Sequence, residues 1–259
     1  MQVNQTFEDE NRAYWHNRSS GYAKVNQDEL SSMQHDVWRD VLCGHIHRGD
    51  DGVDKKDLHV LDIGTGPGFF SILLAEQGYR VSAVDYTEAM LEQAKNNAGD
   101  LVGQITFYQM NAEELHFDDN SFDAIVTRNL TWNLPHPQKA YREWLRVLKK
   151  GGILLNFDAN WYRYLYDDTA LQGHLKDRQN IKSCQVADET EGTDIAAMES
   201  IAQKVPLSSL QRPQWDEKVI TALGGNVRVD TDIWKTVWTH DEYINNSSTP
   251  MFLIEVRKR

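Results

Sequence analysis

Three glycines within five residues mark the part of the chain best suited to binding a polar ligand. Gly64, Gly66 and Gly68 stand where a continuous apolar run ends and a helical pattern begins. Backbone N–H groups at a helix start have no partner inside the helix and can receive a carboxylate or phosphate. A dinucleotide-binding fingerprint needs glycine at position 69, and Phe69 stands there, which counts against NAD or FAD. Because glycine is entropically expensive in a plain turn, the loop predicts a ligand.

An acidic residue ends the next apolar run. Asp85 closes YRVSAVD, 21 residues after Gly64. An acid at this place can accept hydrogen bonds from both ribose hydroxyls of a nucleoside. A helix cap is the alternative role, because a helical pattern follows. With the glycine loop, Asp85 indicates a nucleoside-containing ligand.

The elements that position these residues alternate between strands and helices. Helices are predicted at 69–77, 87–98 and 138–150, and strands at 58–64, 79–85, 105–110, 122–128 and 151–159. This alternation is typical of right-handed βαβ crossovers. We therefore predict an α/β fold, a doubly wound, Rossmann-like, mostly parallel sheet of about seven strands. A helix at 216–223 and an antiparallel C-terminal hairpin formed by 226–234 and 251–259, joined by a polar loop, would complete it.

Segments on either side of the core are expected to be helical additions. The N-terminal segment, 7–47, is expected to be helical with breaks near Gly21 and Gly44, and a charged loop at 47–57 ends it. The segment after the core, 161–213, has no strand pattern. Its part 183–200 contains five acidic residues and no basic one, which suggests a partly mobile cap. The predicted division is an N-terminal helical extension (1–57), a cofactor-binding core (58–160), an inserted cap (161–213) and a C-terminal helix and hairpin that complete the core (214–259).

Composition narrows the class of protein. The 259 residues are 40% hydrophobic and 25% charged, as expected for one large globular domain. A net charge of −12 disfavours nucleic acid as a partner. No apolar stretch is long enough to span a membrane, and the first residues lack the apolar segment of a signal peptide. Cys43 and Cys184 are too few for a disulfide framework or a cysteine metal site. We expect a reduced, cytoplasmic protein without a membrane partner.

The motifs LDIGTGPG, VSAVD, NAEELHFDDNSFDAIVTRN and LRVLKKGGILLNFD resemble, in this order, those of class I S-adenosylmethionine-dependent methyltransferases. The small-molecule enzymes of ubiquinone and menaquinone biosynthesis are the nearest type. The resemblance covers residues 60–158, and the ordered set is much more specific than the glycine loop alone. It implies S-adenosylmethionine as cofactor, a small-molecule O, N, S or C nucleophile as methyl acceptor, and release of S-adenosylhomocysteine.

The resemblance also implies the cofactor site. The glycine loop and Asp62 would border the methionine, Asp85 would bind the ribose, and Tyr86 and Met90 would cover adenine. Relatives commonly have Asp where Asn111 stands, and its amide oxygen can accept without charge. A turn role for Asn111 and a solvent ion pair for Arg128 are the alternatives. The implied set is Asp62, Gly64, Thr65, Gly66, Gly68, Asp85, Tyr86, Met90, Asn111, Ala112, Glu113, Arg128 and Asn129.

The acceptor side is less defined. In-line methyl transfer needs mainly positioning, and a base only where the nucleophile holds its proton firmly. The catalytic residue is therefore unassigned, with Asp158, Asn160 and His16 as weak candidates, and no metal site is expected. The predicted substrate pocket consists of aromatic residues at strand ends, which could bind an aromatic or cationic acceptor or pack the cap: Trp132, Trp161, Tyr162 and Tyr166.

Other functions share parts of this pattern. A nicotinamide-dependent oxidoreductase has a similar layout, but Phe69 argues against it. A non-catalytic S-adenosylmethionine-binding module would carry the same cofactor motifs, although a long cap suits an enclosed second ligand. A protein methyltransferase is a further alternative. The acceptor and the oligomeric state are not indicated.

Overall fold

The computed structural model of the chain describes residues 6–47 and 52–259, and a seven-stranded sheet runs through its centre. The strand order is β3-β2-β1-β4-β5-β7-β6. β1 to β5 are parallel, and β7 is antiparallel to both of its neighbours. The predicted fold class is confirmed. The strands are β1 (His59–Ile63), β2 (Arg80–Asp85), β3 (Ile105–Gln109), β4 (Phe122–Arg128), β5 (Leu148–Asp158), β6 (Gly225–Asp230) and β7 (Phe252–Lys258).

Both faces of the sheet are covered by helices. Val60 and Leu61 are neighbours in β1 and point to opposite faces, and they belong to different buried clusters. One cluster includes Trp38 and the first residues of α3, and the other includes Trp144 of α5. This explains why the parallel strands are continuously apolar. The helices of the core are α3 (Phe69–Glu76), α4 (Glu88–Ala98), α5 (Pro137–Val147) and α8 (Gln214–Ala222).

Two helices precede the sheet, α1 (Phe7–Leu30) and α2 (Met33–Ile46). The predicted breaks near Gly21 and Gly44 are wrong, because both glycines lie inside a helix. The chain breaks instead at Ser31 and Ser32, where the Ser32 hydroxyl accepts from the Gln34 N–H and caps α2. Part of the predicted charged loop, 48–51, lies outside the described residues, and η1 (Lys55–Asp57) follows it.

Two further boundaries differ from the prediction. α5 ends at Val147, not near 150, because Leu148 already pairs with Phe122 of β4. The segment between β6 and β7 contains α9 (Trp234–Val237) and α10 (His240–Asn246) in place of a polar loop. Trp234 and Trp238 pack against the core there, so this segment has apolar side chains to bury.

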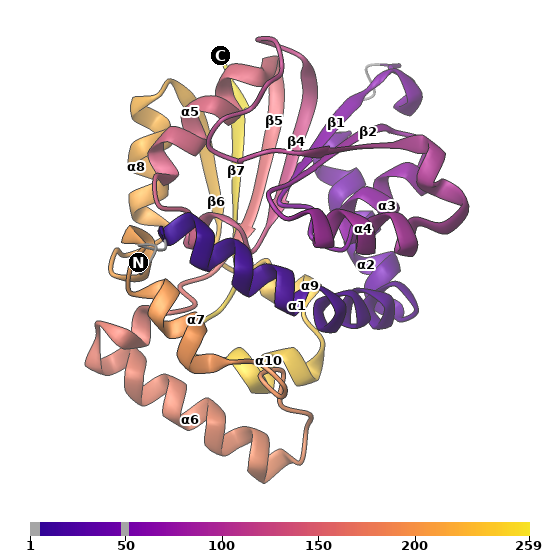
Figure 1. Cartoon of the computed structure of the whole chain (residues 1–259). Coiled ribbons are helices and arrows are strands. Elements are labelled where there is room, and N and C mark those ends of the chain that lie inside the picture. Colours follow the sequence, from indigo (N-terminus) through magenta and orange to yellow (C-terminus); the bar gives the residue numbers. More distant parts are fainter. Residues whose placement is uncertain (1–5, 48–51) are drawn as a thin grey trace, which may run out of the picture.

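The segment after β5 forms a helical layer beyond the strand ends. It consists of η4 (Arg163–Leu165), α6 (Asp168–Cys184), α7 (Ile195–Ala202) and η5 (Pro206–Ser208). Figure 1 shows α1, in indigo, lying between the lower end of the sheet and this layer. A small apolar cluster that includes Tyr14, Trp132 and Met198 joins α1 to α7. The mobility of this cap stays a prediction.

Candidate functional site

The glycine loop connects β1 to α3 with backbone angles that favour glycine. Gly64, Gly66 and Gly68 have φ values of +67°, +52° and +93°. A Cβ on Gly68 would lie 3.0 Å from the Cβ and 3.2 Å from the Cα of Ala94 in α4. Only glycine therefore allows the loop to approach α4 this closely.

Asp62, at the end of β1, fixes this loop and the start of α3 by hydrogen bonds. Its carboxylate accepts hydrogen bonds from the Thr65 and Ser71 hydroxyls, both at 2.7 Å. Burial raises its pKa, and the two hydroxyl donors oppose that shift. Asp62 borders the pocket, although its Oδ2 is already engaged by these two hydroxyls.

Asp85, at the end of β2, is hydrogen-bonded to the same loop. Its carboxylate accepts from the Gly66 N–H at 3.0 Å and from the Thr87 N–H at 2.8 Å. Burial raises the pKa of Asp85 to about 6, against the effect of these two donors. It forms a turn before α4 rather than the helix cap predicted as the alternative, because Thr87 is the N-cap, and it also borders the pocket.

The residues implied for adenine lie on one side of the same pocket. Tyr86, Met90, Asn111 and Ala112 line it, and the Arg12 guanidinium of α1 lies 4.2 Å from the centre of the Tyr86 ring. Asn111 also forms a turn, because its Oδ1 accepts from the Glu113 N–H at 2.8 Å.

Glu113 is oriented differently from its neighbours. It is buried and accepts from the His136 N–H at 2.6 Å, and it is not among the lining residues. It therefore supports the connection that precedes α5 rather than the pocket wall.

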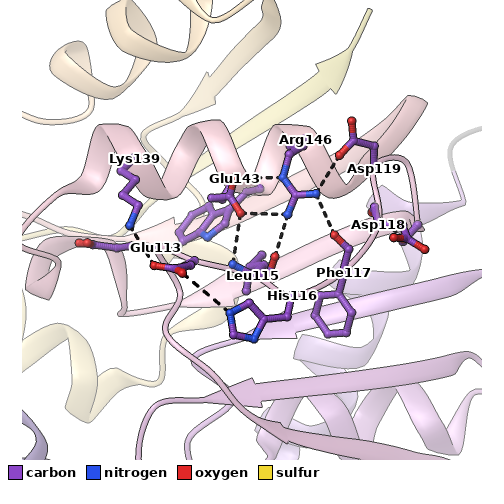
Figure 2. A network of polar contacts seen from close by, with 12 residues as sticks. Glu113, Leu115, His116, Phe117, Asp118, Asp119, Lys139, Glu143 and Arg146 are labelled. Carbon is purple, nitrogen blue, oxygen red and sulfur yellow. Dashed lines mark hydrogen bonds and ion pairs between the residues drawn. The ribbon is translucent and has the colours of Figure 1, made fainter.

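The segment after Asn111 is fastened to α5 by Arg146, as Figure 2 shows. The guanidinium donates to the carbonyls of Leu115, at 2.7 Å, and Phe117, at 2.8 Å. It also pairs with Glu143 and Asp119. Glu143 in turn accepts from the Leu115 N–H. This network sets the path of the chain just beyond the pocket wall.

Arg128, the last residue of β4, contributes a buried cation. Its guanidinium pairs with both carboxylate oxygens of Glu29 in α1, at 2.7 and 2.9 Å. It also lies 4.6 Å from the centre of the Phe69 ring. Arg128 is therefore in an ion pair, as in the alternative reading, but a buried one that borders the pocket.

Helix α1 supplies the outer wall of the pocket. Among its residues, Trp15 and Tyr22 line the pocket, whereas Arg18 does not. Gly68 of the predicted set does not line the pocket. Lining residues that the sequence reasoning missed are Phe7, Glu8, Asn11, Asn26, Phe69, Phe70, Val84, Thr87, Met110, Leu130, Asn133, Leu134 and Pro135.

A second pocket adjoins the first, and Trp15, Tyr22 and Asn129 line both. It lies between the strand ends and the cap, and its walls are rich in aromatic rings. The predicted residues Trp132, Trp161 and Tyr162 line it, together with Tyr164, His174, Asp177, Arg178, Thr190, Thr193, Ile195, Met198, Asn245, Asn246 and Thr249.

The rings of this second pocket pack against one another. Trp132 and Tyr162 have ring centroids 4.7 Å apart, and Tyr164 stacks on His174 at 4.0 Å. Tyr166 is not among the lining residues, and its hydroxyl donates to the Gln203 carbonyl. Burial raises the pKa of Tyr162, so its phenol stays neutral.

The three weak catalytic candidates lie away from the junction of the pockets. Asp158 is buried and pairs with Arg212 at 2.7 Å, and it accepts from the Trp132 N–H at 2.9 Å. Asn160 exchanges hydrogen bonds with the Arg212 backbone. His16 lies on the exposed side of α1.

The described residues include neither a metal-binding group nor a membrane-spanning helix. Across 6–47 and 52–259, no group of three or more His, Cys, Asp or Glu side chains could hold a metal ion. Within these same ranges, no helix is both long enough and apolar enough to cross a membrane.

S-adenosylmethionine suits the residues of the first pocket. Glycine backbone, with no Cβ in the way, offers room beside the loop, and Asp85 places a carboxylate next to it. A doubly wound sheet with a glycine loop after β1 and an acid at the end of β2 is the layout of a nucleoside-binding α/β domain, as the resemblance to class I S-adenosylmethionine-dependent methyltransferases implies.

Comparison with known proteins agrees with this class. Residues 61–156 match the family described as "Methyltransferase domain". The ubiquinone/menaquinone biosynthesis C-methyltransferase UbiE of Zymomonas mobilis is 36% identical over 151 residues, which is 52% of this chain and 62% of that protein. UbiE of Yersinia pestis is 36% identical over 149 residues, which is 54% of this chain and 55% of that protein. Residues 61–156 thus match a methyltransferase domain, and the predicted resemblance is confirmed.

Solved structures share the fold. A protein of Methanococcus maripaludis, described as a candidate S-adenosyl-L-methionine-dependent methyltransferase, superposes with a TM-score of 0.57 at 21% identity, covering 100% of this chain and 97% of that one. Phosphoethanolamine N-methyltransferase 2 of Haemonchus contortus superposes with a TM-score of 0.57 at 16% identity. The match covers 85% of this chain and 52% of that one. The chain spans about three fifths of the length of the Zymomonas relative, so the acceptor is a matter for proposal.

Proposed function

We propose that the whole protein transfers the methyl group of S-adenosylmethionine to a small-molecule acceptor bound in the second pocket. The observation that carries this proposal is the junction of two pockets, which share Trp15, Tyr22 and Asn129. One pocket has the features of a cofactor site, and the other is lined by aromatic side chains and by residues of the cap. Two ligands could therefore meet at the shared wall.

The residues of the first pocket would hold the cofactor by their predicted roles. Asp85 would accept from the ribose hydroxyls, Tyr86 and Met90 would cover the adenine, and Asn111 and Ala112 would meet its edge. The glycine loop and Asp62 would border the methionine, next to Arg128 and Asn129. These assignments agree with the places of the side chains around the pocket.

When bound, S-adenosylmethionine would supply an electrophilic methyl group. The acceptor's nucleophilic atom would bond to the methyl carbon as the S–C bond breaks, and the electron pair of that bond would stay on sulfur. Any proton that the acceptor loses would pass to water. The chain's own contribution is to position the two ligands and exclude water. The aromatic walls around Trp132 and Tyr162 would desolvate the acceptor. The UbiE relatives are named as C-methyltransferases, which favours a carbon nucleophile.

A small-molecule acceptor also fits the charge and surroundings of the second pocket. Asp177 and Arg178 bring opposite charges to its wall, and Arg178 pairs with Asp188 at 2.8 Å. A pocket with such aromatic walls suits a metabolite rather than a protein tail or nucleic acid. The cytoplasmic location stays a prediction from the sequence.

The test is calorimetric titration with S-adenosylmethionine, S-adenosylhomocysteine and NADH. We expect both sulfur compounds to bind in the micromolar range and NADH to remain silent. Asp85→Ala should weaken both affinities at least tenfold, whereas Asp100→Ala, a change at an exposed acid beyond α4, should leave them unchanged. Methyl acceptance is then screened with small molecules. Binding without turnover on any acceptor would favour a non-catalytic binding module, and binding of NADH alone would overturn the proposal.

A further inference from the structure

Glu8, in the first turn of α1, brings a carboxylate to the wall of the cofactor pocket. We propose that this carboxylate accepts a hydrogen bond from the exocyclic amine of the cofactor's adenine ring, and thereby selects adenosine-containing cofactors over those with a 6-oxo purine. This inference rests on the proposed function and deepens it, because it names the residue that distinguishes the base of the cofactor.

Two contacts hold this end of α1 against the side of the pocket assigned to adenine. One turn after Glu8, the Oδ1 of Asn11 accepts from the side-chain amide of Asn133 at 3.1 Å, and both residues line the pocket. The Arg12 guanidinium lies 4.2 Å from the centre of the Tyr86 ring. Residues three and four positions apart share one face of a helix, so Glu8 lies on the same face as Asn11 and Arg12. Its side chain is therefore held on the adenine side of the pocket.

The other amide and carboxylate oxygens near Asn111 are either engaged or inaccessible. Asn111 Oδ1 accepts from the Glu113 N–H at 2.8 Å, and Asn11 Oδ1 accepts from Asn133. The Oδ1 of Asn133 is buried and has no surface that a ligand could reach. Glu113 accepts from the His136 N–H and does not line the pocket. These four groups therefore leave the amine of a bound adenine without a free side-chain acceptor.

The Glu8 carboxylate is available to a ligand. Glu8 is exposed and also lines the pocket, and its carboxylate forms no hydrogen bond or ion pair with the residues that the structure describes. Burial raises the pKa of Glu113, and the charge of Glu8 raises it further, which places Glu8 near the segment that begins at Asn111. A ligand in the pocket can therefore reach this carboxylate at open surface.

A carboxylate distinguishes two kinds of purine by the direction of the hydrogen bond. The 6-amino group of adenine donates, and an ionised carboxylate can only accept. A 6-oxo purine has an oxygen at the same place, so two acceptors would face each other without a shared proton. A site that pairs with a donor discriminates strongly against an analogue that lacks it. Because Glu8 is exposed, solvent screening makes the expected discrimination moderate.

This assignment gives α1 a part in the recognition of the cofactor. Glu8 lies outside residues 61–156, which match the methyltransferase domain. The same helix brings Trp15 and Tyr22 to the junction of the two pockets. One helix thus contacts the base with its first turn and borders the acceptor pocket further along. The choice of base then depends on an addition to the core rather than on the core alone.

The experiment compares S-adenosylhomocysteine with S-inosylhomocysteine, which carries a 6-oxo purine in place of adenine. Calorimetric titration gives the ratio of the two affinities, and any effect of Glu8 on the parts that the ligands share cancels in this ratio. We expect the wild type to prefer S-adenosylhomocysteine about tenfold or more, and Glu8→Ala to reduce this preference about three- to tenfold. Glu8→Gln should bind S-inosylhomocysteine more tightly than Glu8→Ala does, because its amide nitrogen can donate to the 6-oxo group.

Asp28→Ala is the matched control. Asp28 is an exposed acid of the same helix that lines neither pocket, so this change should leave the preference unaltered. Thermal melting checks that each variant is folded. An unchanged preference in Glu8→Ala, or an equal loss of affinity for both ligands, would overturn the inference, while binding of S-adenosylhomocysteine to the wild type upholds the proposed function. Absence of that binding would instead overturn the proposed function, and this inference with it.

Discussion

Glu29, near the end of α1, forms a two-point ion pair with Arg128, the last residue of β4, at distances of 2.7 and 2.9 Å. The side chains are only 15% and 12% exposed, respectively. This pair joins the helix that walls the cofactor pocket to a strand end beneath it. Charge thus fastens the wall of the pocket, in addition to the apolar cluster that joins α1 to α7.

Breaking this pair should weaken both the fold and the pocket. Glu29→Gln leaves the Arg128 cation buried without its counter-charge, and we expect the free energy of unfolding to fall by about 2–4 kcal/mol. Urea denaturation measures this. Asp28→Asn, at the exposed neighbouring position, is the control and should change stability by less than about 0.5 kcal/mol. Equal effects of the two changes would contradict the importance of the pair.

Cofactor affinity should depend on pH through Asp85. Its pKa is raised to about 6, so the carboxylate is ionised above that pH and able to accept from two ribose hydroxyls. At pH 5 only about a tenth of the molecules are ionised, and the affinity for S-adenosylhomocysteine should be roughly tenfold lower than at pH 7.5.

Calorimetry across this pH range provides the measurement, with Asp85→Asn as the comparison. The variant has no group to titrate at this position, so its weaker affinity should vary little between pH 5 and 7.5. A wild-type affinity that is flat with pH would mean that Asp85 does not bind the ribose as an anion.

The close approach of Gly68 to α4 makes a specific stability prediction. Gly68→Ala adds a methyl group against Ala94, including its backbone, at a φ of +93°. Gly78→Ala meets nothing within 4 Å at a φ of +83°, so it carries the backbone penalty alone. We expect Gly68→Ala to be about 1–3 kcal/mol more destabilising by urea denaturation. Similar losses would show that α4 moves aside freely.

Arg212 should be essential to the fold rather than to turnover. It is fully buried between Asp158, at 2.7 Å, and Asp216, at 2.9 Å. Arg212→Met leaves two buried carboxylates without a cation, and we expect a loss of about 3–5 kcal/mol. Arg228→Met, on an exposed position of β6, is the matched control. If Arg212→Met melted at the same temperature as Arg228→Met, the prediction would be wrong.

The sequence predicted the sheet well because each core strand is a short apolar run closed by Gly, Asp or Asn. It also predicted the residues around Asp85 and the glycine loop, since these belong to contiguous motifs. It could not predict that Glu29 reaches Arg128, 99 positions later, or that Arg212 engages Asp158. Such pairs depend on how helices are placed over strand ends, and no local pattern records that.

The helix boundaries show the same limit. Gly21 and Gly44 were expected to interrupt helices because glycine is a poor helix former. Capping by Ser32 and the burial of Trp38 and Leu42 in the core outweigh that preference. Tertiary packing and capping, rather than intrinsic propensity, decided where these helices end.

The position of β7 between β5 and β6 has a consequence for how the chain acquires its structure during synthesis. β6 has no sheet neighbour other than β7, yet it leaves the ribosome first. Until β7 follows, the open edge of β5 and the whole of β6 remain unpaired, and unpaired strand edges promote aggregation. Of the seven strands, β7 is therefore the one that closes the sheet, so chains that stall before it would leave these strand edges exposed.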